Sequence, residues 1–283
     1  METTIMAPAK LNLFLDIVGR RDDGYHFVDM VMQSVTLCDR VTVSINQGDG
    51  GISIECSAPD IPCDDTNTAY KAVELFYCAV GRSVPQVSIS IEKNIPSQAG
   101  MAGGSTDAAA VLKALNELEN AGLSADELRS IAGNIGADVP FCIEGGTVRA
   151  TGIGTDLERL SPLADCAFAI VKPEISVSTG KAYRLSDEVG YGSPADIGPV
   201  LDGIASGSIE AVAGGLYNKF EDVLDLPEIE SIKSLLIANG ALGALMTGSG
   251  SAVFGIFRRC DLSSELISRM KKQMNVMIAY PEK

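Results

Sequence analysis

Apolar and polar residues alternate in several short stretches of the chain, and this pattern predicts β-strands. Val41, Val43 and Ile45 give one such alternation, and the turn-forming run 19–24 separates it from an earlier apolar stretch. On this basis we expect strands at 6–18, 31–45, 52–56, 87–91, 145–151, 168–171, 244–246, 253–257 and 276–280.

Other stretches have the three-to-four-residue spacing of amphipathic helices. Ala69, Val73, Phe76 and Val80 fall on one face of such a helix. Ser124 and Glu127 have the spacing of a capping box, which marks the start of another. We expect helices at 66–80, 105–119, 124–135, 179–185, 229–238 and 262–274, and one or two helices within 196–213.

These strands and helices follow one another without a regular strand–helix alternation, which favours an α+β fold. A length of 283 residues is typical of two domains. We place them at 1–155 and 156–283, because the stretch 152–165 is the best candidate boundary. A ligand site is expected in the cleft between the two halves.

The charge of the chain limits its partners. The sequence has 22 Lys and Arg against 37 Asp and Glu, a net charge of −15, which argues against nucleic acid as a partner. An anionic ligand would need a site built locally from backbone N–H groups or a few cations. No apolar stretch is long enough to span a membrane. Nothing in the sequence indicates an obligate protein partner.

The cysteines and the single histidine exclude several kinds of chemistry. The seven cysteines are scattered, odd in number and without a C-x-x-C pair, which indicates reduced thiols in a cytoplasm. His26 is the only histidine, which argues against most zinc sites. A G-x-S-x-G nucleophile turn is absent.

A glycine-rich loop at 100–104 follows an expected strand and leads into an expected helix. Glycines allow close backbone approach, and a helix N-terminus presents unpaired N–H groups to an anion. With the hydroxyls of Ser105 and Thr106, this arrangement predicts a phosphate cradle. It is neither a Walker loop nor a Rossmann fingerprint. A simple turn before a capped helix is the structural alternative, and the glycines alone leave the two interpretations equal.

Three motifs in order carry a resemblance to a known family. The strings Ala-Pro-Ala-Lys-Leu-Asn-Leu at 7–13 and Gly-Arg-Arg-Asp-Asp-Gly-Tyr-His at 19–26 resemble the opening of the 4-diphosphocytidyl-2-C-methyl-D-erythritol kinases. These belong to the galactokinase, homoserine kinase, mevalonate kinase and phosphomevalonate kinase (GHMP) superfamily. The glycine-rich loop resembles its second motif and the stretch 245–254 its third.

The resemblance implies a two-domain GHMP kinase-like fold with the active site in the interdomain cleft. It also implies that ATP, with Mg²⁺ shielding its phosphates, phosphorylates the 2-hydroxyl of 4-diphosphocytidyl-2-C-methyl-D-erythritol. That reaction is a step of the non-mevalonate isoprenoid precursor pathway. The expected partner is therefore a small cytidyl diphosphate substrate.

The resemblance also assigns residues, with Lys10 and Asp138 as the catalytic pair. From the residues alone, Lys10 could be a surface lysine with a partly buried stem, and Asp138 could be a helix cap. The residues implied for ATP are Pro96, Ala99, Gly100, Met101, Ala102, Gly103, Gly104, Ser105, Thr106, Lys93 and Asn67. Those implied for the cytidyl substrate are Asn12, Tyr25, His26, Thr179, Tyr183, Thr247 and Gly248. No metal ligand is assigned.

At the cytidyl end, Tyr25 and Tyr183 are expected to stack on the cytosine ring from opposite halves, because aromatic rings stack on bases. His26 is expected to read the edge of the ring. A half-buried helix tyrosine and a turn histidine are the structural alternatives for Tyr183 and His26.

The sequence departs from the family pattern at three positions. Ala102 replaces a frequent glycine, which a methyl group tolerates if φ is negative there. Thr155 replaces a glutamate and Lys219 an aspartate. Another superfamily kinase, such as mevalonate or homoserine kinase, and a catalytically silent binding protein stay as alternatives. The string 23–26 argues against the first, and the presence of both Lys10 and Asp138 against the second.

Overall fold

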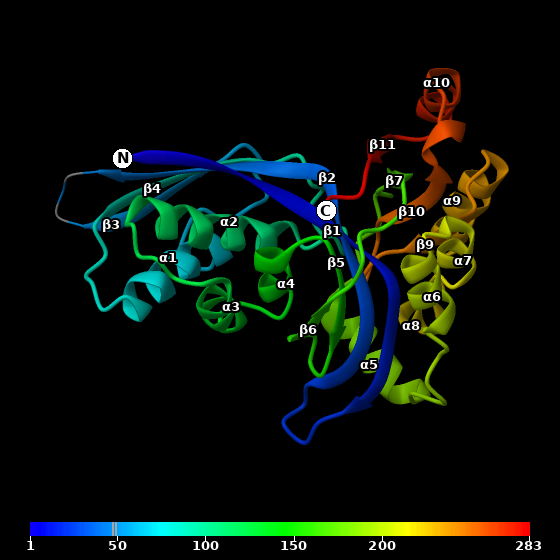
Figure 1. The fold of residues 1–283 in the computed structure, drawn as a ribbon, viewed down its shortest axis with the longest axis horizontal. Coiled ribbons are helices and arrows are strands. Elements are labelled where there is room, and N and C mark those ends of the chain that lie inside the picture. Colours follow the sequence, from blue (N-terminus) through cyan, green and yellow to red (C-terminus); the bar gives the residue numbers. More distant parts are fainter. Residues whose placement is uncertain (47, 49) are drawn as a thin grey trace. The chain divides into compact units, whose positions relative to one another are not determined.

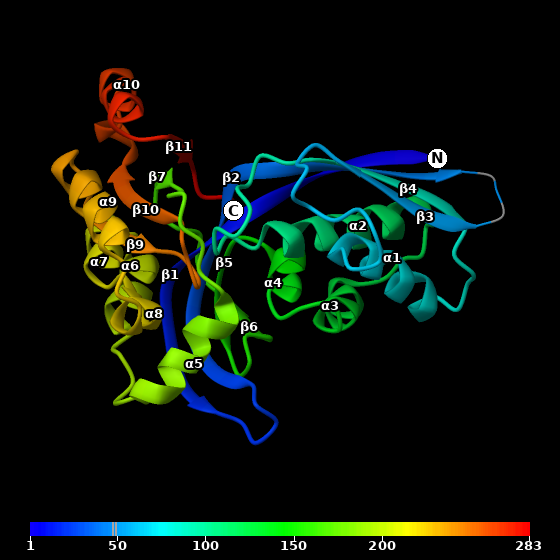
Figure 2. The same cartoon turned by 180° about the vertical axis from the view of Figure 1, so that it is seen from behind.

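The chain forms two compact units, each assembled from several segments. The computed structural model describes residues 1–46, 48 and 50–283. Unit 1 comprises Met1–Ala9, Cys38–Pro96 and Ala102–Gly145, and unit 2 comprises Lys10–Leu37, Ser97–Met101 and Gly146–Lys283. Both units mix helices with strands (Figures 1 and 2), so the α+β class expected from the sequence is confirmed.

Unit 1 has a layer of strands with helices on one face (Figures 1 and 2). β4 pairs with β3 in parallel and with the C-terminal part of β2 in antiparallel. Val41 and Val43 of β2 are buried, as are Val87 and Ile89 of β4, because alternate side chains point to the face that the helices cover. The elements are β2 (His26–Asn46), β3 (Gly51–Cys56), β4 (Gln86–Glu92), α1 (Thr68–Ala79), α2 (Gly103–Leu118), α3 (Ala125–Gly133) and α4 (Val139–Glu144).

Unit 2 holds the rest of β1 (Glu2–Arg20) and β2 together with three short strands. β5 pairs with β2 in antiparallel, β6 pairs with β5, and β8 pairs with β1 in parallel at Phe14 and Leu15. The parallel pairing brings the segment after Tyr217 beside β1. The three strands are β5 (Thr147–Thr151), β6 (Asp156–Arg159) and β8 (Tyr217–Asn218).

A second sheet in unit 2 has the order β11-β7-β10-β9, with every pair antiparallel. All residues of β7 are buried, and α7 and α9 contact β9, beside which they lie in Figure 1. The elements are β7 (Cys166–Val171), β9 (Gly243–Met246), β10 (Val253–Arg258), β11 (Val276–Ala279), α5 (Thr179–Val189), α6 (Gly198–Ser206), α7 (Ile209–Gly214), α8 (Lys219–Val223), α9 (Pro227–Ala238), a 3₁₀ turn (Arg259–Asp261) and α10 (Ser264–Gln273).

The expected strands and helices are present, and the predicted capping box of Ser124 and Glu127 is formed. The stretch 196–213 contains two helices, α6 and α7. The sequence analysis missed α4, β6, β8 and α8, which have between two and six residues each. Elements this short complete too few turns or alternations to give a periodic signal.

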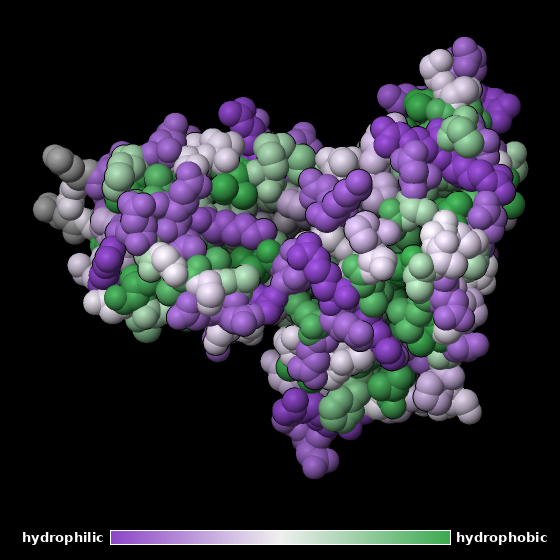
Figure 3. All heavy atoms as spheres, in the orientation of Figure 1, coloured by the Kyte–Doolittle hydropathy of each residue, from purple (hydrophilic) through white to green (hydrophobic). Residues whose placement is uncertain are grey.

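The surface has hydrophilic residues spread over the face drawn in Figure 3, with apolar residues in smaller areas between them. Within residues 1–46, 48 and 50–283, no helix has the length and apolar character that crossing a bilayer requires.

Candidate active site

The first half of the glycine-rich loop, Ser97–Met101, belongs to unit 2 and packs on the third motif. The N–H of Ala252 donates to Ala99 O at 3.2 Å. Gly100 has φ of +72°, and a Cβ there would lie 2.1 Å from the carbonyl oxygen of Thr247. Glycine is therefore required here because another backbone lies too close for a side chain. The sequence alone does not distinguish this requirement from close approach of a ligand.

The second half of the loop, 102–106, belongs to unit 1 and forms the start of α2. The first N–H groups of a helix have no partner within it, and they carry the positive end of its dipole. Gly103, Gly104 and Ser105 supply these groups here, and Thr68 Oγ1 donates to Gly104 O at 2.7 Å. This geometry suits a phosphate group.

Ala102 precedes α2 in the left-handed conformation, with φ of +59° and ψ of +30°. From the sequence, alanine is expected to fit here if its φ is negative. The positive φ does not meet that condition. A side chain in this conformation costs about 1–2 kcal/mol, which glycine would avoid. The substitution is accommodated at that cost.

Lys93, one of the expected ATP residues, lies between two carboxylates of unit 1. Its ammonium donates to Asp39 and, at 2.7 Å, to Asp107 Oδ2. The three side chains are almost fully buried, with 7% of Lys93, 0% of Asp39 and 4% of Asp107 exposed. The sequence analysis missed both aspartates, although Asp107 stands directly after the Ser105-Thr106 pair of the loop.

Asn67, also expected at the ATP site, caps α1. Its Oδ1 accepts from Ala69 N at 2.9 Å, and its Nδ2 donates to Pro62 O at 2.6 Å. These bonds give Asn67 a structural role, and contact with ATP stays a prediction for it.

Lys10, Asn12 and Thr247 come together in unit 2. Only 4% of Lys10 is exposed, so the alternative of a surface lysine is wrong. Lys10 Nζ donates to Asn12 Oδ1, which places the two side chains on one face of β1, and Asn12 N donates to Thr247 Oγ1 at 2.9 Å. The first and third motifs are thereby joined around a buried ammonium group.

Asp138 stands at the N-cap position of α4 in unit 1. Its backbone is helical, with φ of −83° and ψ of −15°, and its side chain makes no capping hydrogen bond. The capping role that the sequence alone favoured is therefore absent. Lys10 and Asp138 belong to different compact units, and their pairing stays a prediction.

Around His26, unit 2 has a cluster of aromatic and charged side chains. The ring of His26 stacks on Tyr183 with centroids 4.5 Å apart, and its Nε2 lies 2.7 Å from Asp187 Oδ1. Tyr191 donates to the same oxygen at 2.5 Å, and these two hydrogen bonds hold the pKa of Asp187 below its usual value. The helical spacing of Tyr183 and Asp187, four residues apart, is a signal that the sequence analysis missed.

The other residues expected at the cytidyl end are also in unit 2. Tyr25 is 58% exposed, whereas Tyr183 is half-buried and has Phe220 edge-on at 5.1 Å. Thr179 bonds to Ser249 at 2.7 Å. The face of Tyr183 that His26 covers is thus occupied in this structure.

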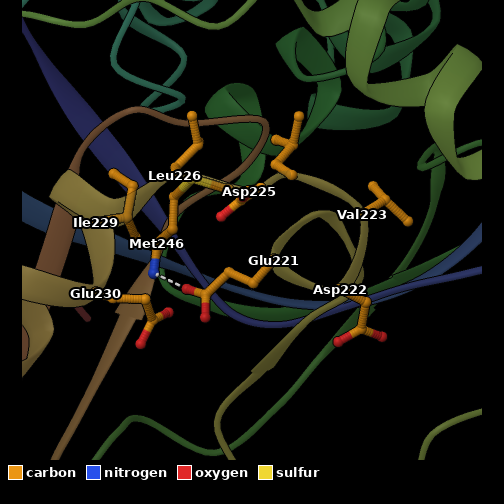
Figure 4. Close-up of a pocket in the computed structure, with 9 residues that line it drawn as sticks. Glu221, Asp222, Val223, Asp225, Leu226, Ile229, Glu230 and Met246 are labelled. Atoms are coloured by element: carbon orange, nitrogen blue, oxygen red, sulfur yellow. Dashed lines mark hydrogen bonds between the residues drawn. The ribbon is translucent and has the colours of Figure 1, made fainter.

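The segment containing Lys219 supports the third motif. Asn218 Nδ2 donates to the carbonyl groups of Met246 and Gly248 at 2.7 and 2.8 Å. Glu221 accepts from Met246 N at 2.6 Å, across a pocket drawn in Figure 4. Lys219 itself pairs with Asp222 at 3.4 Å, so its departure from the family pattern does not disturb these supporting bonds. Thr155 lies in the turn between β5 and β6.

The described residues contain no group of three or more His, Cys, Asp or Glu side chains able to hold a metal ion. Mg²⁺ that accompanies a nucleotide is held largely by phosphate oxygens and water. The N–H groups at the start of α2 suit the phosphates of such a nucleotide.

Comparisons with known proteins extend over both units. Sequence models described as GHMP kinases N terminal domain and GHMP kinases C terminal match residues 67–146 and 202–276. The chain is 43% identical over 277 residues to the 4-diphosphocytidyl-2-C-methyl-D-erythritol kinase of Desulfitobacterium hafniense (strain Y51), covering 97% of this chain and 93% of that protein. This chain belongs to that kinase family. The protein of the same name from Brevibacillus brevis is 44% identical, with 92% of this chain and 89% of that protein covered.

Solved structures agree with this family. The crystal structure of a 4-(cytidine 5'-diphospho)-2C-methyl-D-erythritol kinase has a TM-score of 0.83 at 30% identity and covers 99% of this chain and 100% of its own. A homoserine kinase from Cytophaga hutchinsonii has a TM-score of 0.76 at 18% identity, covering 100% and 94%, and shows the shared fold alone. The two matched kinase segments fall on either side of residue 155, and the continuous boundary expected there stays a prediction because the compact units interleave.

Proposed function

We infer that this protein transfers a phosphoryl group from ATP to the 2-hydroxyl of 4-diphosphocytidyl-2-C-methyl-D-erythritol. The observation that carries this conclusion is identity of 43–44% over more than nine-tenths of the chain to kinases named for that substrate. The pathway is the non-mevalonate route to isoprenoid precursors.

The ATP phosphates are proposed to bind at the start of α2. It offers N–H groups and a helix dipole to an anion without a cationic surface, which suits a chain with a net charge of −15. Mg²⁺, when bound with ATP, neutralises charge on the phosphates. Pro96, Ala99, Met101 and the residues of the loop that follow are proposed to complete this nucleotide site.

Lys10 and Asp138 are the proposed catalytic pair. Phosphoryl transfer to an alcohol needs a carboxylate that accepts the hydroxyl proton and a cation that stabilises charge on the transferring group. Buried Lys10 supplies a cation, with Asn12 and Thr247 holding the strand around it. Asp138, at the N-cap position of α4, is proposed as the proton acceptor.

The cytidyl group is proposed to bind near His26 and Tyr183, with Tyr25, Thr179 and Gly248. His26 has its Nε2 directed to Asp187, so Nδ1 is the nitrogen proposed to face the base. An exposed Tyr25 is available for stacking, whereas Tyr183 must first part from His26 if it is to stack on the base with the same face.

We also propose that the protein acts in the cytoplasm as a small-molecule enzyme without an obligate protein partner. None of the seven cysteines, each within the described residues, forms a disulfide, which suits a reducing compartment.

The deciding experiment measures ADP release by the purified protein with ATP and Mg²⁺. We expect turnover only when the cytidyl substrate is added, with mevalonate and homoserine giving no increase. Turnover with mevalonate or homoserine, and none with the cytidyl substrate, would show that the substrate assignment is wrong. Binding of both ATP and the cytidyl substrate without turnover would support the silent binding protein instead.

A further inference from the structure

Three buried side chains of unit 1 connect the two flanks of the glycine-rich loop. Asp39 Oδ1 accepts from the backbone N–H groups of Asn94 and Ile95, at 2.6 and 2.8 Å, just before the loop begins. Lys93 joins Asp39 to Asp107, which stands in the second turn of α2 just after the loop. We refer to Asp39, Lys93 and Asp107 as the loop clamp.

The loop clamp has two carboxylates and one ammonium group. If all three were ionised, a net negative charge would be buried, which is costly. Asp39 accepts from two backbone N–H groups and from Lys93, whereas Asp107 accepts from Lys93 at Oδ2. Asp107 Oδ1 is buried and has no hydrogen-bond partner among the described residues. A proton that neutralises the clamp therefore belongs on Asp107.

Burial and the Asp39 charge both favour the neutral form of Asp107, whereas Lys93 favours the charged form. Together, burial, the attraction of Lys93 and the repulsion of Asp39 place the pKa of Asp107 at about 7, above its usual value. The thiol of Cys56 on β3 faces the same charges, and its own pKa is raised chiefly by burial. The carboxyl of Asp107 therefore titrates near neutral pH.

The loop clamp lies directly beside the N-terminus of α2. A Cβ on Gly103, the first residue of the helix, would be 3.3 Å from Lys93 Nζ. Phosphate at this N-terminus would thus lie close to the clamp, and an ionised Asp107 would oppose it by like-charge repulsion.

We propose that Asp107 is a positioning residue for ATP, which takes up a proton from solvent when the phosphates bind at the N-terminus of α2. The proposal rests on the proposed function, because it needs the phosphates at that helix end. The proton adds to Oδ1, the oxygen without a partner, while Oδ2 stays bonded to Lys93 and the link between the loop flanks is kept.

The sign of the pH effect follows from linkage. Bound phosphate favours the protonated form of Asp107, so ATP binds most tightly below pH 7 and its affinity falls as the pH rises above 7. A shift of one pKa unit, from about 7 to about 8, gives about a sixfold rise in the Kd of ATP between pH 6.5 and 8.5. The same shift gives uptake of about half a proton per ATP near pH 7.5.

The test is calorimetry of ATP binding to the wild-type protein and to Asp107→Asn, at several pH values and in buffers of different ionisation enthalpy. The asparagine mimics the protonated acid, so Asp107→Asn should bind ATP at pH 8.5 about as tightly as the wild type binds it at pH 6.5. Its remaining proton uptake is that of the ATP phosphates, which titrate themselves. Asp60→Asn removes an exposed charge of the same unit and should keep the wild-type pH profile.

Two results would overturn the proposal: the same pH profile in Asp107→Asn as in the wild type, or no proton uptake by the wild type beyond that of ATP. The second measurement needs no variant, so it decides the question even if Asp107→Asn does not fold. Failure of the proposed function looks different, because the wild type would then show no ADP release with the cytidyl substrate.

Discussion

The two halves of the glycine-rich loop use their glycines in different ways. In Ser97–Met101, Gly100 has a positive φ and would place a Cβ 2.1 Å from the backbone of Thr247. In 102–106, Gly103 begins a helix, and its Cβ would lie 3.3 Å from the end of a lysine side chain. One glycine serves backbone packing in unit 2, and the other serves an open helix end in unit 1.

The difference shows that glycines of the same motif can have different roles. The half Ser97–Met101, in which a side chain at position 100 would collide with another backbone, fixes the loop to the third motif. The half 102–106, in which an added Cβ has more space, is the one that suits phosphate. The proposed catalytic groups divide in the same way, with Asp138 in unit 1 and Lys10 in unit 2. Substitutions in the two units should therefore have separable effects.

The largest effect is expected from Asp138→Asn. Loss of a general base lowers turnover by roughly 10²–10⁴-fold. Because asparagine keeps the size and shape of the side chain, the fold should be unchanged, and Kd values for ATP and the cytidyl substrate should stay near those of the wild type. Steady-state kinetics with a thermal unfolding control measures this. Near-normal turnover in the folded variant would refute the catalytic assignment.

The second largest effect is expected on the free energy of unfolding, in a comparison of Gly100→Ala with Gly103→Ala. The first variant adds a left-handed alanine, at about 1–2 kcal/mol, and overpacking against backbone, at about 1–3 kcal/mol. The second replaces a helical glycine whose added Cβ would lie 3.3 Å from Lys93 Nζ, a contact that a shift of a few tenths of an ångström relieves, so its free energy of unfolding should stay within about 1 kcal/mol of the wild type.

Denaturant unfolding and ATP titration of both variants test this comparison. We expect Gly100→Ala to lose stability, and Gly103→Ala to keep stability while its affinity for ATP falls more than its affinity for the cytidyl substrate. Equal losses of stability in the two variants would mean that the halves of the loop do not differ as we describe.

Tyr183→Ala tests the cytidyl end of unit 2. Stacking on a base contributes about 1–3 kcal/mol, so the KM of the cytidyl substrate should rise by about 5- to 150-fold while the KM of ATP hardly changes. Tyr183→Phe keeps the ring that contacts His26 and should be close to the wild type. If Phe is as damaging as Ala, the hydroxyl carries the effect and stacking is the wrong explanation.

How far the sequence could predict this molecule depended on the range of each signal. The long strands, the capping box at Ser124 and the α+β class follow from local periodicity, and they are confirmed. The burial of Lys10 and the bonds from Asp39 to Asn94 and Ile95 depend on contacts between distant segments, which no local pattern contains. The left-handed backbone of Ala102 could not be predicted either, because alanine carries no sequence signal for a positive φ.

The smallest effect is expected at the junction between the two halves of the loop, from Ala102→Gly. Glycine adopts the left-handed backbone of this position without the steric cost that alanine has there, about 1–2 kcal/mol. Glycine also gives the unfolded chain more conformational entropy, which offsets about 0.4–1 kcal/mol of that gain. The net expectation is a rise of up to about 1.6 kcal/mol in the free energy of unfolding, with little change in the KM of ATP. Matched denaturant curves with Ala125→Gly, at an exposed helical alanine of the same unit, should show a loss of stability instead. A loss of stability in Ala102→Gly would mean that the methyl group makes a contact worth more than the strain, and that the junction is fixed by packing and not by backbone conformation.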